Sequence, residues 1–118
     1  MIYNIGIDIV HIPKFKKAVE RWGDKIKKRI FTKGELAYCE KRRFAEQHLA
    51  ARFAAKEAFI KAIGRRLSPK EIVVENNSDG KPYLVSNAQL PLKLLTHLTL
   101  SHDGDYCIAQ VILEEKEQ

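Results

Sequence analysis

The sequence has 118 residues, 45% hydrophobic and 31% charged, a composition typical of a globular protein with a single core. We therefore expect one domain over residues 1–118. No apolar run comes near the ~20 residues needed to span a bilayer, and the N-terminus lacks the basic leader and cleavage site of a signal peptide. The two cysteines, Cys39 and Cys107, match no metal-binding spacing. We expect them to be reduced thiols of a cytoplasmic protein.

The net charge of +6 is unevenly distributed along the chain. Residues 1–66 carry 17 Lys and Arg against 7 Asp and Glu, whereas residues 67–118 carry 4 against 8. The densest basic block covers residues 13–33. This asymmetry indicates an acidic partner, which could be nucleic acid, a membrane surface, an acidic protein or a phosphorylated small molecule. A solvated helix face would have the same composition, so charge alone does not decide.

The N-terminal half predicts one strand followed by helices. Residues 2–10 are rich in β-branched residues and predict the strand. Pro13 suits the first turn of a helix that reaches about residue 22. Thr32 and Glu35 have the spacing of a capping box, which begins a helix to about residue 41. A longer helix is expected over residues 45–63, with Gly64 at its end.

Four further strands are predicted in the C-terminal half. They cover residues 71–76, 81–85, 98–103 and 106–114, and turn-forming segments join them into two hairpins. The order of one strand, then helices, then hairpins predicts an α+β fold. We expect an antiparallel sheet packed against a long central helix and shorter helices.

Glu57 is a carboxylate in the middle of the long predicted helix, on the same stripe as Phe53 and Ile60. A buried lone carboxylate costs several kcal/mol unless a cation or metal ion pairs with it. One interpretation is a surface pair with Lys61, four residues later, worth only about 0.3–0.5 kcal/mol. The other is a functional carboxylate that meets a ligand.

Asp8 is an acid in the middle of the first predicted strand, where Asp is disfavoured. Gly6 shares its strand face and leaves room for a close approach to the backbone. An edge strand whose Asp8 faces water is the simpler interpretation. If Asp8 and Glu57 converge, they offer the oxygen ligands that Mg²⁺ prefers. The cationic side chains that could then hold phosphate groups are Arg52, Lys56, Lys61 and Lys81.

Ser101 and His102 are neighbours on a predicted strand. Their side chains therefore point to opposite faces and do not form a catalytic dyad. His102 is either a phosphate contact or a polar residue beside a turn.

Several ordered motifs resemble those of the bacterial holo-acyl-carrier-protein synthases, a type of 4′-phosphopantetheinyl transferase. They are IGIDIV at residues 5–10, FTKGEL at 31–36, RFAAKEAFIKA at 52–62, DGKPYL at 79–84 and LSHDGDYCIAQV at 100–111. The resemblance covers nearly the whole chain. It implies transfer of the 4′-phosphopantetheine arm of coenzyme A to a serine of apo acyl carrier protein, with release of adenosine 3′,5′-bisphosphate.

The resemblance also implies roles for individual residues. Asp8 and Glu57 correspond to the Mg²⁺-binding acids, and Lys61 to a catalytic lysine near the pyrophosphate of coenzyme A. The positions that correspond to the rest of the coenzyme A site are Arg52, Lys81, Pro82 and His102. Small bacterial members are homotrimers with sites between subunits. One subunit would then present Asp8 and Glu57, and its neighbour would supply other contacts of coenzyme A.

An acidic acyl carrier protein would account for the basic block near the N-terminus. Lys14, Lys17 and Arg21 recur at three- and four-residue steps and so share one helix ridge. They are our candidates for docking the carrier protein, where charge mainly raises the rate of association.

The sequence departs from the family pattern in two places. Ala51 replaces a glycine, and residues 61–68 (KAIGRRLS) lack a glycine-rich loop near the substrate site, which leaves the coenzyme A contacts of that region open. A small nucleic-acid-binding module is an alternative that suits the pI of about 9.4 but leaves Asp8 and Glu57 unexplained. An inactive family member that only binds its ligands is a further alternative.

Overall fold

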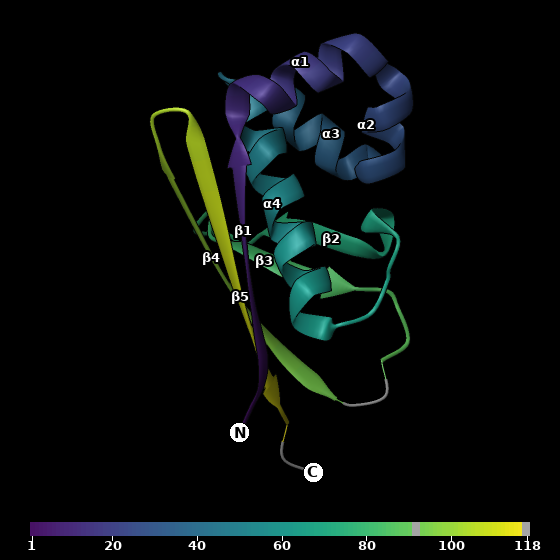
Figure 1. The fold of residues 1–118 in the computed structure, drawn as a ribbon, viewed down its shortest axis with the longest axis vertical. Helices are drawn as coiled ribbons and strands as arrows, with labels where there is room; N and C mark the ends of the chain where they lie inside the picture. Colours follow the sequence, from purple (N-terminus) through teal and green to yellow (C-terminus); the bar gives the residue numbers. More distant parts are fainter. Residues whose placement is uncertain (91–92, 117–118) are drawn as a thin grey trace.

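The structure, a computed structural model, describes residues 1–90 and 93–116. Its elements in chain order are β1 (Ile2–His11), α1 (Ile12–Trp22), α2 (Asp24–Ile30), α3 (Lys33–Glu40), α4 (Ala45–Ile63), a 3₁₀ turn (Pro69–Glu71), β2 (Ile72–Asn76), β3 (Pro82–Ser86), β4 (Leu94–Asp103) and β5 (Tyr106–Glu115). One antiparallel sheet has the order β1-β5-β4, and β2 pairs with β3 in a second. Helix α4 lies along the three-stranded sheet, and α1, α2 and α3 gather at one end of it (Figure 1). The predicted α+β fold is confirmed.

Two elements differ from the sequence-based expectation. Helix α2 was not predicted, because Gly23 marks the end of α1 and none of the residues of α2 is buried. Gly23 ends α1 with a φ of 62° and the chain starts a new helix at once. Strand β4 begins at Leu94 instead of residue 98, since pairing with β5 continues to Leu94 opposite Glu115. Within the described residues, no helix is long and apolar enough to cross a membrane.

Strand β1 and helix α4 approach each other more closely than any side chain would allow. A Cβ atom placed on Gly6 would lie 2.0 Å from the carbonyl oxygen of Ala58 and 2.8 Å from the amide nitrogen of Ala62. The helix face that lies here is built from small, fully buried residues, among them Ala54, Ala58 and Ala62. The room predicted beside Gly6 is therefore filled by the protein's own helix.

The other side of β1 is apolar and exposed. Ile5, Ile7 and Ile9 share this face, as their alternation predicts, and they are 57%, 57% and 60% exposed. Ile108 of β5 lies opposite Ile9 and is also exposed. We call these four isoleucines the outer face of the sheet. Such a contiguous apolar surface usually marks a contact with another molecule.

Replacing Gly6 by alanine should destabilise the protein, because the new methyl group meets helix backbone that cannot turn away. We expect a loss of roughly 1–3 kcal/mol in the free energy of unfolding, measured by urea denaturation. Gly34→Ala is the matched control, since the nearest atom to its Cβ is 4.0 Å away and alanine favours helix. Equal stability of the two variants would contradict the close contact.

Candidate active site

Asp8 from β1 and Glu57 from α4 line one cavity of about 400 Å³. The rest of its wall is mainly apolar and comes from β1, α1, α2 and α4. Asp8 follows Gly6 by two residues, and Glu57 precedes Ala58 by one. The contact between Gly6 and Ala58 therefore brings both carboxylates to the same place.

Lys61 completes this cluster. Its Nζ donates a hydrogen bond to Asp8 Oδ1 at 3.0 Å and another to the carbonyl oxygen of Ile7 at 3.0 Å. The side chain of Asp8 is only 15% exposed, although β1 is an edge strand. A water-facing Asp8 and a Glu57–Lys61 surface pair were the simpler interpretations, and both are wrong for the part of the chain that the structure describes.

The pKa of Glu57 is raised above its ordinary value. Burial is the main cause, the negative charge of Asp8 adds to it, and the charge of Lys61 opposes it. Glu57 does not lie on the most buried side of α4, where the expected stripe would have put it. That side is formed by alanines and Phe59, so Glu57 occupies a half-buried flank. The negative charges of Asp8 and Glu57 thus repel each other in a partly buried cavity.

The donor set of this cavity suits Mg²⁺. Among residues 1–90 and 93–116, no cluster of three or more Asp, Glu, His or Cys side chains could enclose a metal ion. Mg²⁺ does not need such a cage, because it typically takes one or two carboxylates, keeps several waters and binds substrate phosphates. Asp8 and Glu57 offer such a pair of hard oxygen ligands.

Lys56 belongs to a different, wholly buried cluster, so the expectation that it could hold phosphate groups is wrong. Its Nζ donates to Glu35 Oε1 at 2.6 Å and to the carbonyl oxygen of Ile30 at 2.6 Å, and its side chain is 0% exposed. Glu35 forms the predicted capping box with Thr32 and also accepts a hydrogen bond from the amide of Val74 at 2.9 Å. The pair ties α4 to α3 and β2.

A second cavity, of about 430 Å³, contains the other predicted coenzyme A residues. Arg52, Lys81, Pro82 and His102 all line it, whereas Lys61 does not. No carboxylate is among its lining residues. The two cavities share no lining residue and lie on different flanks of α4.

Arg52 is the most buried cation of the second cavity, at 4% exposure. It donates from its terminal Nη2 to Asn76 Oδ1 at 2.6 Å, while its Nε has no hydrogen-bond partner among the described residues. Buried polar groups are almost always paired, so an unpaired N–H of this kind suits an anionic ligand.

Arg52 is surrounded by aromatic and cationic residues that were not predicted from the sequence. Two guanidinium groups lie over the ring of Tyr38. The guanidinium carbon of Arg52 is 4.3 Å from the ring centre, and that of Arg42 is 3.5 Å from it. His48 lies beside this group, and burial, followed by the charges of Arg52 and Arg42, lowers its pKa. Only the four-residue spacing of Tyr38 and Arg42 was visible in the sequence.

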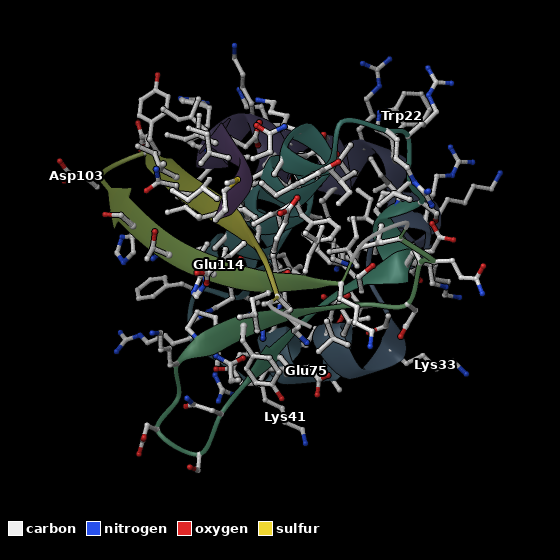
Figure 2. The ribbon with its side chains drawn as sticks, turned by 90° about the horizontal axis from the view of Figure 1, so that it is seen from below. Trp22, Lys33, Lys41, Glu75, Asp103 and Glu114 are labelled. Carbon is white, nitrogen blue, oxygen red and sulfur yellow. The ribbon has the colours of Figure 1, made fainter. Side chains whose placement is uncertain are left out.

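The predicted docking residues Lys14, Lys17 and Arg21 are all exposed on α1. Lys14 also lines the cavity of Asp8 and Glu57. Trp22 follows this ridge at the periphery of the molecule, and it is 60% exposed (Figure 2). The basic ridge therefore borders the carboxylate cavity.

Both cysteines are free thiols and buried. Burial raises the pKa of Cys39, and burial with the charge of Asp8 raises that of Cys107 to about 11. Neither is a reactive thiolate at neutral pH.

Comparison with known proteins shows the family of the chain. The family model of the 4′-phosphopantetheinyl transferase superfamily matches residues 4–111. A holo-[acyl-carrier-protein] synthase of Trichlorobacter lovleyi is 44% identical, over 97% of this chain and 98% of its own. One of Wolbachia pipientis is 41% identical, over 96% and 94%.

Solved structures have the same fold. The crystal structure of the holo-(acyl-carrier-protein) synthase of Bacillus anthracis in complex with CoA (3′,5′-ADP) has a TM-score of 0.84 and 33% identity, covering 98% of this chain and 99% of its own. That of Neisseria meningitidis has a TM-score of 0.86 and 30% identity, covering 98% and 100%. The chain belongs to the 4′-phosphopantetheinyl transferase superfamily and is an enzyme of that class. Within the superfamily, these relatives are holo-[acyl-carrier-protein] synthases.

Replacing Glu57 by glutamine should stabilise the protein at pH 7.5 in the presence of a chelator. We expect a gain of less than about 1 kcal/mol in the free energy of unfolding, because this group is only half-buried and water screens its charge. Folding raises the pKa of Glu57, so its charged form costs stability at pH values above the unfolded pKa, near 4.5. At pH 4 the carboxyl is mostly protonated in both states, and the gain should largely vanish.

Urea unfolding at the two pH values measures this difference. Glu20→Gln, at an exposed position of α1, controls for the change in net charge. A Glu57→Gln protein that is less stable than the wild type at pH 7.5 would refute the electrostatic cost.

Proposed function

We propose that the chain transfers the 4′-phosphopantetheine arm of coenzyme A to a serine of apo acyl carrier protein, in the cytoplasm and with Mg²⁺ as cofactor. The observation that carries this proposal is the convergence of Asp8, Glu57 and Lys61 beside a basic helix ridge. The names of its relatives, which are holo-[acyl-carrier-protein] synthases, and the crystal structure of one of them with CoA (3′,5′-ADP) support this reaction. The chain would act as a single transferase domain over residues 1–118.

Asp8 and Glu57 would hold the Mg²⁺, which supplies neutralisation of the charge that develops on the phosphoryl oxygens and the leaving group. Lys61 would donate a hydrogen bond from its ammonium group to the diphosphate. Most of the catalysis would therefore come from positioning and electrostatic stabilisation by groups fixed on β1 and α4.

The serine oxygen of the carrier protein attacks the β-phosphorus of coenzyme A. The bond from that phosphorus to the oxygen bridging to adenosine 3′,5′-bisphosphate breaks, and the bisphosphate leaves. The serine proton passes to a carboxylate oxygen of Glu57, directly or through a water. Glu57 suits this role by position, because it lines the same cavity as Asp8 and Lys14.

Arg52, Lys81, Pro82 and His102 would hold the anionic nucleotide end of coenzyme A. The cationic lining of their cavity and the unpaired Nε of Arg52 support this. Tyr38 would keep the guanidinium group of Arg52 in place.

A homotrimer would complete the site. The carboxylate cavity and the cationic cavity share no lining residue. The exposed isoleucines of the outer face support self-association. Packing of a neighbour against this face would bring the carboxylate cavity of one subunit towards the cationic cavity of the next.

An acidic carrier protein would dock on Lys14, Lys17 and Arg21. Between this ridge and the carboxylates, Phe15, Val19 and Ile30 give the cavity an apolar wall. The serine of a carrier protein held on α1 would thus lie next to Asp8 and Glu57.

Incubation of apo acyl carrier protein with the enzyme, coenzyme A and Mg²⁺ should add about 340 Da to the carrier protein, measured by mass spectrometry. Asp8→Ala and Glu57→Ala should slow transfer by about 100-fold or more, because each removes an electrostatic contact in the transition state. Glu46→Ala, at an exposed carboxylate of the same helix, should leave transfer unchanged. No mass gain with the wild-type chain would support the binding-only alternative, and near-normal transfer by Asp8→Ala would contradict the metal site.

Charge reversal of the docking ridge should affect one substrate only. We expect Lys14→Glu with Arg21→Glu to raise KM for carrier protein roughly tenfold and to leave KM for coenzyme A within about twofold, because the lost attraction is to the protein. Steady-state kinetics at two salt concentrations measure both, and salt should shrink the effect. Lys41→Glu with Lys70→Glu, at exposed sites outside the ridge, is the control, and equal effects of the two double variants would rule out specific docking.

A further inference from the structure

We propose that Lys61 competes with the divalent cation for Asp8, and that the ammonium group released from Asp8 then binds the substrate's diphosphate. This rests on the proposed function, in which Asp8 and Glu57 hold the metal ion. It adds a second role to Lys61, which so far has been only a contact of the diphosphate.

The first observation is that the negative charge of Asp8 is balanced by Lys61. Its side chain is 15% exposed, and a carboxylate so far removed from water needs a cationic or hydrogen-bonding partner. Among the described residues, the ammonium group of Lys61 is the one ion-pair partner of Asp8. A cation that binds Asp8 Oδ1 therefore meets an oxygen that already accepts a hydrogen bond from this ammonium group, and the two positive charges repel each other.

The second observation is that this pair is easily opened. The side chain of Lys61 is 55% exposed, and its partner on the other side is a backbone carbonyl, that of Ile7. Lysine carries a compact charge on a flexible stem, so the ammonium group can move without moving the helix. Ion pairs with an exposed partner typically contribute little to stability.

Lys56 shows the opposite design on the same helix. Its side chain is 0% exposed, and its ammonium group is fixed by Glu35 and by the carbonyl oxygen of Ile30, both at 2.6 Å. Opening that pair would leave a buried charge without a partner, which is strongly unfavourable. Of the two lysines that flank Glu57, Lys61 is therefore the exchangeable one.

The competition predicts that loss of a catalytic lysine increases the affinity for the metal ion. Removing Lys61 should tighten the binding of a divalent cation in the absence of coenzyme A, while it slows transfer. A lysine that contacts only the substrate would leave metal affinity unchanged. A lysine that supports the shape of the site would weaken metal binding when it is removed.

The test is titration of the purified full chain with Mn²⁺, followed by electron paramagnetic resonance, without coenzyme A. Mn²⁺ favours the same oxygen ligands as Mg²⁺. We expect Lys61→Met to bind Mn²⁺ roughly two- to fivefold more tightly than the wild type, as loss of an exposed ion pair implies. Methionine keeps the length of the side chain and removes the charge.

Lys14→Met is the matched control, because Lys14 lines the same cavity but has no ion pair with Asp8. Its Mn²⁺ affinity should change much less than that of Lys61→Met. Unchanged or weaker binding by Lys61→Met, or an equal gain in both variants, would overturn the competition. Circular dichroism of each variant should match that of the wild type, which checks that the fold is retained.

A further comparison separates this inference from the proposed function. Mn²⁺ binding at the proposed site should be present in the wild type and lost in Asp8→Asn. If the wild type shows no such binding, the proposed metal site is wrong, and so is the competition. If that binding is present but Lys61→Met does not tighten it, only the competition is wrong. With coenzyme A added, we expect the advantage of Lys61→Met to disappear, because the wild-type lysine then binds the diphosphate.

Discussion

The backbone of β1 lies against the backbone of α4 at Gly6 and Ala58, and the geometry of the whole site follows from this contact. Asp8 and Glu57 stand within two residues of it on the strand and on the helix. Both elements are held by the core, where alanines of α4 pack on the sheet and the inward residues of β5 are fully buried. The carboxylates are thus positioned by rigid elements and not by a loop, which suits catalysis that depends on placement.

Adjacent residues of α4 point in different directions and therefore have different surroundings. Lys56 points into the protein, where its ammonium group donates to Glu35 and to a backbone carbonyl, and Glu35 accepts a further bond from a backbone amide. Glu57 points to the flank, where Asp8 is its nearest negative neighbour and raises its pKa. A buried pair of this kind adds little net stability, but breaking it is costly. It therefore holds α3 and β2 in one arrangement relative to the helix that carries Glu57.

The two cavities differ in electrostatic character. One contains Asp8 and Glu57 together with Lys14, and the other contains Arg52, Lys81 and His102 with no carboxylate in its wall. Their separation on different flanks of α4 keeps the cations of the second cavity from pairing with Asp8 and Glu57.

Periodicity, capping and turn signals determined most of the helices and strands, because these signals act over only a few residues. They predicted the strand of residues 2–10, the capping box of Thr32 and Glu35, and the helix of residues 45–63. The motifs also identified Asp8, Glu57 and Lys61 as residues of interest. The tertiary structure alone decided what each of them meets. Because α4 is buried on most sides, its pattern contains no single apolar stripe, and the sequence does not show that Lys56 is internal while Lys61 reaches Asp8. The same holds for Tyr38 and Arg52, whose contact depends on how α3 packs against α4 and not on any local signal.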